Sequence, residues 1–184
     1  MNKLPPSFYV QPTVQAAQAL LGKQLVRTFP DGRKIIVRIT ETEAYHQFGD
    51  RASHSYNGLT KRNAAMFETG GIAYVYLIYG IHHCLNVVTE KKHTGAAVLI
   101  RAAEPVEGLD LIRTHRNHAS SLMDGPGKLT MALKIDRSLN FHRLDEPPLQ
   151  LLDGSPTRAE QVTTTTRIGI SKSKDLPWRF LLSR

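Results

Sequence analysis

An alternating run of apolar residues near the start of the chain most constrains its fold. Three apolar residues at every second position predict a strand over residues 34–39: Ile35, Val37 and Ile39. Neighbouring side chains of a strand point to opposite faces, so these three share one face. If the alternation continues, Glu41, Glu43 and Tyr45 extend the same apolar face. Carboxylates rarely face a core without a partner or a function, so the strand predicts a site at its far end.

Turn residues divide the remaining chain into short elements. Helices are predicted over residues 12–21, 105–116 and 128–134, and further strands over residues 24–29, 73–79, 81–89, 96–101, 149–152, 167–170 and 178–182. The strands at 73–79 and 81–89 form a predicted hairpin with Tyr79 and Gly80 near its tip. Strands and helices do not alternate regularly, which favours the α+β class. We therefore expect one compact domain over residues 1–184, with a curved, mainly antiparallel sheet flanked by helices and a protruding hairpin.

The overall charge points to a polyanionic partner. The 184 residues carry a formal net charge of +8, and Lys and Arg side chains that neutralise phosphates release condensed counterions. The same charge would also serve solubility alone. The one cysteine, Cys84, cannot form an internal disulfide. It favours a reducing compartment, the cytoplasm, with the nucleoid in a bacterium or the nucleus in a eukaryote. No apolar run is long enough to span a bilayer, so no membrane partner is expected.

Glu43 and Arg101 form the first candidate catalytic pair. A carboxylate at the floor of a pocket can take a proton from a water molecule as that water attacks a sugar carbon. Burial disfavours the charge of such a carboxylate, and a nearby cation restores it. Arg101 ends the strand predicted over residues 96–101 and is the candidate cation. The alternative is a structural ion pair at a strand end, and Glu41 competes for the catalytic role.

Aromatic side chains follow this carboxylate in the sequence. In a shared pocket, Tyr45, His54 and Tyr76 would stack on a flipped purine, and a cationic alkylated base would gain cation–π attraction. Tyr79 would wedge into the base stack in place of the extruded nucleotide. The alternatives are core packing for the pocket tyrosines, an ordinary loop role for His54 and a surface role for Tyr79.

Two further motifs favour structural roles. His82 and His83 precede Cys84, but adjacent strand residues point to opposite faces and cannot readily share one metal ion. A single cysteine also excludes zinc sites that need two, so no metal is expected. The segment 125–128 lacks the glycine spacing and the Ser or Thr of a nucleotide-binding phosphate loop. Its backbone amides and Lys128 would still suit a DNA phosphate, and a simple helix entry is the alternative.

Blocks of residues spread in order along the chain match one family pattern. They are residues 39–45 (ITETEAY), 54–55 (HS), 61–67 (KRNAAMF), 73–80 (AYVYLIYG), 85–87 (LNV), 98–105 (VLIRAAEP) and 124–129 (DGPGKL), with weaker matches at 167–170 and 178–180. Together they resemble the 3-methyladenine (alkyladenine) DNA glycosylases. Several long blocks in order are much more specific than any single motif among them.

The resemblance implies a DNA-repair enzyme that removes damaged purines from duplex DNA. Members of this family bind the minor groove, flip the base out and hydrolyse its N-glycosidic bond by water attack, leaving an abasic site. Their substrates are alkylated purines and, for many members, hypoxanthine or ethenoadenine. The family needs no metal or organic cofactor, and we expect a monomer. No lysine stands out as a Schiff-base nucleophile, so we expect a monofunctional glycosylase without strand cleavage.

The resemblance also implies a role for particular residues. By the family pattern, Glu43 activates the attacking water and Arg101 lies beside it. The base-binding residues are then Tyr45, His54, Tyr76 and Asn86, of which Asn86 restricts purines with an extra exocyclic group. Tyr79 is the intercalating residue. Apart from the resemblance, we expect the basic residues Lys128, Arg62 and Arg167 to contact DNA phosphates.

Small departures from the family pattern leave the range of lesions open. The loop before Lys61 is shorter by about one residue, and Phe141 stands where many members have glycine. Three other function classes compete with this reading. A nucleic-acid-binding module without chemistry would release no base, a zinc nucleobase deaminase would need the absent cysteine pair, and a small-molecule nucleosidase would lack steep salt dependence.

Overall fold

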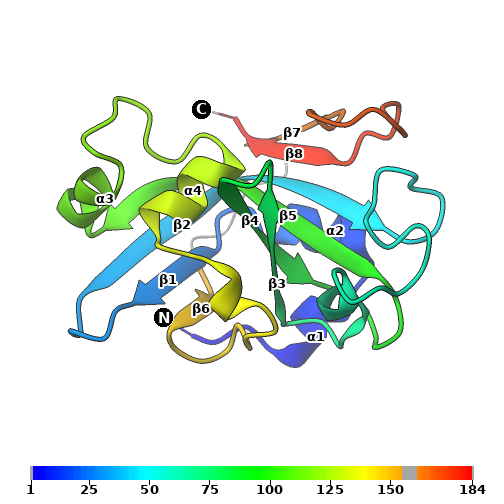
Figure 1. Cartoon of the computed structure of the whole chain (residues 1–184), viewed down its shortest axis with the longest axis horizontal. Helices are drawn as coiled ribbons and strands as arrows, with labels where there is room; N and C mark the ends of the chain where they lie inside the picture. The colour runs from blue at the N-terminus through cyan, green and yellow to red at the C-terminus, as the bar shows by residue number, and fades with distance from the viewer. Residues whose placement is uncertain (1, 155–160, 184) are drawn as a thin grey trace.

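The structure is a computed structural model that describes residues 2–154 and 161–183. The helices and strands follow in this order: α1 (Pro6–Tyr9), α2 (Thr13–Ala19), β1 (Gln24–Thr28), β2 (Lys34–His46), η1 (Ala64–Phe67), β3 (Ala73–Ile78), β4 (His82–Val88), β5 (Ala96–Glu107), α3 (Leu109–His115), α4 (Pro126–Ala132), η2 (Arg137–Leu139), β6 (Leu149–Leu152), β7 (Val162–Thr165) and β8 (Arg179–Leu182). Figure 1 shows the strands at the centre of the molecule with short helices around them. This arrangement confirms the α+β class.

Within the described residues, every pairing between strands is antiparallel. The order is β3-β4-β5-β2-β1-β6, while β8 pairs with β2 and β7. One edge of β2 pairs with β5 along its length, and the other edge changes partners. That second edge pairs with β1 over residues 34–38 and with β8 over residues 41–43. In Figure 1 the strands β7 and β8 accordingly lie along the upper side of the molecule, above β2.

A bend in the middle of β2 decides which of its side chains reach the main core. The pairing register with β5 shifts twice between residues 39 and 42. Before the shift, Ile39 belongs to the core. After the shift, Ala44 belongs to it, and the Thr42 hydroxyl donates a hydrogen bond of 2.7 Å to the Ala17 carbonyl oxygen in α2. Even-numbered residues therefore replace odd-numbered ones on the core face.

This inversion makes one sequence prediction wrong. We expected Glu41, Glu43 and Tyr45 to continue the apolar face, but an extra residue in a strand turns every later side chain to the other face. Glu43 and Tyr45 therefore lie on the side of the sheet that carries Leu99 and Arg101 of β5. Because of the bend, the Glu43 carboxylate lies on the opposite face of the sheet and not in the main core.

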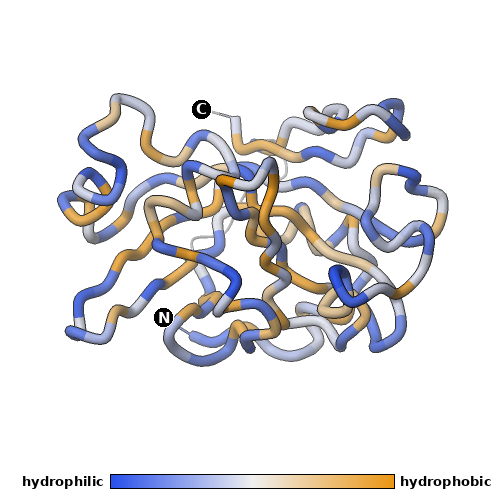
Figure 2. Tube along the Cα trace, in the orientation of Figure 1, coloured by the Kyte–Doolittle hydropathy of each residue, from blue (hydrophilic) through white to orange (hydrophobic). Residues whose placement is uncertain are grey.

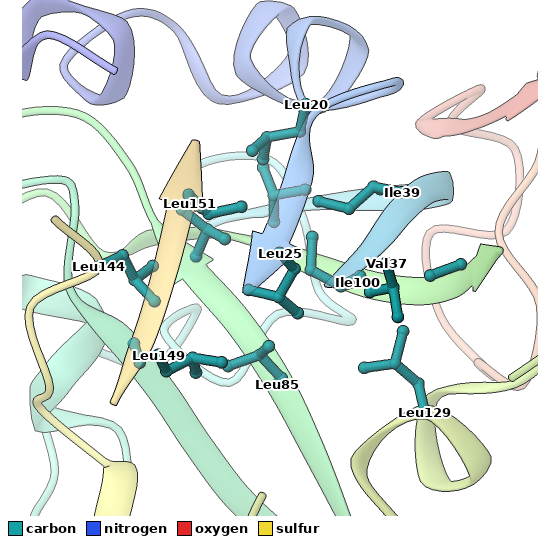
Figure 3. Packing of buried hydrophobic residues seen from close by; sticks show 14 of the residues in the cluster. Leu20, Leu25, Val37, Ile39, Leu85, Ile100, Leu129, Leu144, Leu149 and Leu151 are labelled. Carbon is teal, nitrogen blue, oxygen red and sulfur yellow. The ribbon is translucent and has the colours of Figure 1, made fainter. Parts of the chain in front are cut away.

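The main hydrophobic core covers one face of the sheet. Figure 3 shows side chains from three strands, Leu25, Leu85 and Ile100, packed with Leu20 at the end of α2 and Leu129 of α4. None of these five side chains is exposed, and burying one contributes about 1.5–3 kcal/mol. In Figure 2 hydrophobic stretches run through the interior, and many outer loops are hydrophilic. A smaller cluster on the opposite face has these buried members: Ala65, Met66, Tyr74, Val88 and Ala97.

Two predicted elements differ from the structure. The helix predicted over residues 105–116 begins only at Leu109, because β5 continues to Glu107 and pairs there with β2. Pro105 is tolerated in β5 because β5 pairs with β4 only over residues 97–99, so at Pro105 β4 needs no amide from β5. The strand predicted over residues 167–170 is a loop, and β7 precedes it.

The predicted hairpin is confirmed, with its turn over residues 79–81. Tyr79 has φ of 52° and Gly80 has φ of 73°. Positive φ is costly for an aromatic residue and is often found where function requires a strained backbone. The Tyr79 side chain is 84% exposed.

Among the described residues, no helix is long and apolar enough to cross a membrane.

Candidate active site

A cavity of about 600 Å³ opens on the face of the sheet opposite the main core. Four strands and two loops supply its walls: Tyr45 from β2, Tyr76 from β3, Asn86 from β4, Arg101 from β5, His54 from the loop after β2, and residues 168–172 from the loop after β7. These residues are far apart in sequence, and the strand order β3-β4-β5-β2 brings them together. The predicted base-binding residues thus surround one cavity.

Glu43 lies directly behind the cavity wall. Its side chain is fully buried and does not line the cavity, whereas we expected a carboxylate open at the pocket floor. Three cavity-lining residues donate hydrogen bonds to it. The Tyr45 hydroxyl lies 2.7 Å from Oε2, an Arg101 nitrogen lies 3.4 Å from Oε2, and the Ile168 amide lies 3.0 Å from Oε1. The carboxylate is therefore one side-chain layer away from a bound molecule, and its buried oxygens are satisfied.

Arg101 bridges two carboxylates. Its Nε lies 2.8 Å from Oε1 of Glu41, closer than its contact with Glu43. Arg179 of β8 binds the same Glu41 oxygen at 2.7 Å. Two cations therefore hold Glu41, which favours a structural role for it over the competing catalytic role. The remaining bond of Arg101 points to Glu43, so one guanidinium links the structural carboxylate to the candidate catalytic one.

Aromatic rings form part of the cavity wall. The ring centroids of His54 and Tyr76 are 4.6 Å apart at an interplanar angle of 71°, and those of Tyr74 and Tyr76 are 5.3 Å apart at 30°. Nδ1 of His54 and the Tyr74 hydroxyl form a hydrogen bond of 2.9 Å. Asn86 pairs with Tyr74 across the hairpin and donates its Nδ2 to the Tyr74 carbonyl oxygen at 3.0 Å. The wall is thus built on the adjacent strands β3 and β4, with His54 added from the loop after β2.

The ring wall is uncharged at neutral pH. Burial is the main cause that raises the pKa of Tyr76, and it raises the pKa of Tyr74 to about 12. Burial also raises the pKa of Tyr45, and the neighbouring Glu43 carboxylate adds to this effect. Partial burial and then the charge of Arg62 lower the pKa of His54. Neutral phenols and a neutral imidazole present electron-rich faces without repelling a cation.

Two exposed basic side chains line the cavity, and two others lie close in space or sequence to residues that line it. Arg51 and Lys172 line the cavity and are exposed. The guanidinium of Arg62 lies 5.7 Å from the centroid of the Tyr76 ring. Lys128, at the start of α4, is 43% exposed and pairs with Asp124 at 2.8 Å. These cations leave the mouth open to an anionic partner such as a phosphate chain.

Arg167 does not fit its predicted role at a DNA phosphate. Its side chain is fully buried, and it pairs through two nitrogens with the equally buried Asp50, at 2.6 Å and 2.7 Å. The same guanidinium lies 4.6 Å from the centroid of the Tyr45 ring. A phosphate has no access to Arg167 in this position, so the prediction is corrected. Its basic character suggested this role, but residue type carries no information on burial.

Sequence reasoning missed four residues around the site: Asp50, Tyr74, Ile168 and Arg179. Asp50 and Ile168 lie in irregular loops, where no periodicity separates an inward side chain from an outward one. The only signal for Tyr74 was its position two residues before Tyr76 on a predicted strand, which places both on one face. Among residues 2–154 and 161–183, no three His, Cys, Asp or Glu side chains are grouped to hold a metal ion.

Comparison with known proteins supports the resemblance inferred from the sequence. Residues 7–184 match the family described as methylpurine-DNA glycosylase (MPG). A protein of Carboxydothermus hydrogenoformans is 49% identical over 97% of this chain and 94% of its own length. Relatives from Methanoculleus marisnigri and Chlorobium phaeovibrioides are 48% and 45% identical over 97% of this chain and 94% and 92% of their own lengths. All three are provisionally named 3-methyladenine DNA glycosylases. The chain therefore belongs to the methylpurine-DNA glycosylase family and is a monofunctional DNA glycosylase of DNA repair.

Proposed function

We propose that the enzyme flips a damaged purine out of duplex DNA into the ring-lined cavity and hydrolyses its bond to deoxyribose. One observation carries the proposal: the carboxylate of Glu43 is bonded to three residues that line the same cavity as Tyr76 and His54. A stacked base and a proton acceptor are thereby separated by one layer of side chains. The net charge of +8 suits a duplex as the partner.

In the proposed reaction the lining residues Tyr45, Arg101 and Ile168 separate enough to admit a water molecule to Glu43, which accepts a proton from it. The water oxygen forms a bond to C1′ of deoxyribose while the bond from C1′ to the base nitrogen breaks. The base leaves with that electron pair, so a cationic alkylated purine becomes neutral. The sugar develops oxocarbenium character, which the Glu43 charge stabilises. Oε1 has one recorded partner, the Ile168 amide, and a carboxylate oxygen can accept a second hydrogen bond from the water.

The cavity walls support selection of damaged purines. Tyr45, His54 and Tyr76 hold a flat ring by stacking, and a cationic base gains cation–π attraction to neutral rings. Asn86 reaches the cavity with its amide fixed on the Tyr74 carbonyl. This rigid amide would exclude purines with an extra exocyclic amino group. Alkylated purines are the proposed main substrates, with deaminated and etheno purines as further candidates.

The hairpin and the basic rim support the proposed grip on DNA. Tyr79 stands exposed at the tip, where it would fill the gap left by the flipped nucleotide. Arg62 and Lys128 are the proposed phosphate contacts. Arg62 lies near the ring of the cavity residue Tyr76, and Lys128 is 43% exposed and follows the cavity residue Pro126 by two positions. The proposed enzyme acts as a monomer.

The decisive experiment replaces Glu43 with glutamine. Glu43→Gln keeps the shape of the side chain but removes the proton acceptor, so we expect base release in a single turnover to fall by about 100-fold or more. Binding to a duplex that contains one methylated purine should persist. The matched control is Thr42→Val, at the next residue of β2, which faces the main core and should release base at a near-native rate. Near-native release by Glu43→Gln would show that another group activates the water.

A panel of duplexes, each with one modified purine, tests the substrate range. Free base should be released from methylated purines and measured directly by chromatography. Absence of any released base from the wild-type protein would favour a binding module without chemistry. The loss of affinity for duplex DNA between low and high salt then measures how much phosphate contacts contribute to binding.

A further inference from the structure

The buried pair Asp50–Arg167 joins three segments that meet behind the cavity. Asp50 belongs to the long loop after β2, which leads to His54, and Arg167 belongs to the loop after β7, which leads to Ile168. Arg167 also donates a hydrogen bond of 2.9 Å to the carbonyl oxygen of Ala44, the residue between Glu43 and Tyr45. One guanidinium therefore connects both cavity loops to the strand that carries the candidate catalytic carboxylate.

The contacts of Arg167 extend to two aromatic rings. Its guanidinium carbon lies 4.6 Å from the ring centroid of Tyr45 and 5.4 Å from that of Trp178. Tyr45 is the residue whose hydroxyl donates to Glu43. The guanidinium holds this ring from behind, on a residue that lines the cavity. Movement of Arg167 would therefore move both the stacking ring and one of the three donors of Glu43.

The neighbour of Arg167 supplies a second donor. The Ile168 amide lies 3.0 Å from Oε1 of Glu43, and its position follows that of the residue before it. On the other loop, the Arg51 amide donates to the Ser173 hydroxyl at 3.0 Å, and Arg167 donates to the Ser173 carbonyl oxygen at 3.2 Å. The two cavity loops are thus tied to each other at the buried pair and at Ser173.

A buried ion pair is weak evidence of stabilisation, because desolvation of both charges offsets their attraction. This pair is fully buried on both sides, and Nε of Arg167 has no recorded partner. A hydrophobic pair of similar volume would serve stability as well or better. The retained charges point instead to a requirement for fixed geometry, which the planar fork of arginine provides.

We propose that Asp50 and Arg167 are positioning residues that set the carboxylate of Glu43 and the ring of Tyr45 for base release. This inference rests on the proposed role of Glu43. The pair touches neither the substrate nor the water, and it acts through Tyr45, Ala44 and Ile168. Misplacement of a reacting group by about 1 Å costs about 100-fold in rate. Weakening the pair should therefore reduce the rate of base release more than the affinity for damaged DNA.

The test compares Asp50→Asn, Arg167→Lys and Arg167→Met with the wild-type enzyme on a duplex that contains one methylated purine. We expect single-turnover base release to fall by about 10- to 100-fold in Asp50→Asn, with duplex affinity changed by less than about threefold. Arg167→Lys keeps the charge but loses the fork, so its rate should lie between those of the wild type and Arg167→Met. This order should hold at temperatures where all the variants are equally folded, which separates it from a general loss of stability.

A core variant controls for lost stability. Val37→Ala lies on the core face of β2, where Val37 is fully buried. At a temperature where it is as destabilised as Asp50→Asn, it should keep the wild-type rate. Equal rates in Asp50→Asn and Val37→Ala would overturn the proposal, as would a rate loss explained by affinity alone. If the wild-type enzyme itself released no base, the proposed function would fail first, and that result is distinct from either outcome.

The single tryptophan of the chain gives a local readout that does not depend on activity. Trp178 lies beside Arg167, so its fluorescence should shift in Asp50→Asn and Arg167→Lys while far-ultraviolet circular dichroism stays unchanged. Arg167→Lys also guards against failure of the other variants to fold, because it retains a cation opposite Asp50. Unchanged fluorescence together with wild-type base release in Arg167→Lys would show that the fork is not needed, and the proposal would fall.

Discussion

The two faces of the strands β2 and β5 carry different chemistry although they share one backbone. On one face, Ala44 and Ile100 pack in the main hydrophobic core. On the other face, Glu43 and Arg101 form an ion-pair network beside a cavity. Residues that alternate along the same strands therefore belong either to the hydrophobic core or to the candidate site.

The difference between the faces shows how a buried carboxylate is tolerated. Glu43 is as inaccessible as its core neighbours, but three donors satisfy its oxygens. A lone buried charge would cost many kcal/mol, whereas a bonded one is compatible with the fold. The register shift between residues 39 and 42 separates the two environments. Odd-numbered residues of β2 face the core before the shift, and after it Glu43 faces the opposite side of the sheet.

The largest effect on stability should come from the core face. Leu25→Ala empties a fully buried position of β1 and should lower the free energy of unfolding by about 2–5 kcal/mol. The folded variant should still release base at the wild-type rate. Urea unfolding gives the first quantity, and single-turnover kinetics below the transition gives the second. The control is Val106→Ala, an exposed position of β5, with an expected change within about 0.5 kcal/mol. Slow release by folded Leu25→Ala would show that the two faces are coupled.

An intermediate effect should come from the ring wall. Tyr76→Leu removes a stacking surface, so we expect transition-state binding to weaken by about 1–3 kcal/mol, measured as kcat/KM on a methylated duplex. Tyr76→Phe keeps the ring and serves as the control, with activity near that of the wild type. If both variants lost activity equally, the hydroxyl and not the stacked ring would be the important group.

The smallest effect should be a pH dependence of stability. The pKa of His54 is lowered from 6.5 by partial burial and by Arg62, so the unfolded chain binds this proton more readily than the folded one. The contribution of neutral His54 is complete above pH 6.5 and is lost as pH falls from 6.5 through the lower folded pKa. Urea unfolding across this window should therefore show a steeper loss on acidification for the wild type than for His54→Asn. Parallel curves would contradict the pKa direction.

The sequence predicted much of the fold through local patterns. Alternation identified the start of β2, and the glycine after Tyr79 identified the hairpin turn, because both signals lie within a few residues. The bend of β2 was not predictable in this way. It depends on pairing with β5 and β8, and only those distant strands determine where the alternation inverts.

The site was predictable to a different extent. The roles of Glu43, His54 and Asn86 came from resemblance to a family, since the residue types alone also fitted ordinary structural roles. The pair Asp50–Arg167 joins residues 117 positions apart in sequence. Nothing in either loop separates a buried ion pair from two solvated charges, so Arg167 was placed at the DNA surface. Long-range partners of loop residues require the folded structure.

The exchange of partners along β2 has a consequence for biosynthesis. Residues 41–43 gain their second neighbouring strand only from β8, and Arg179 reaches back across 138 positions to Glu41. A nascent chain that has emerged only as far as β5 would hold Glu43, the proposed proton acceptor, on an unpaired strand edge. Base excision would then be possible only after residue 182 has left the ribosome, so unfinished polypeptides should be unable to release bases.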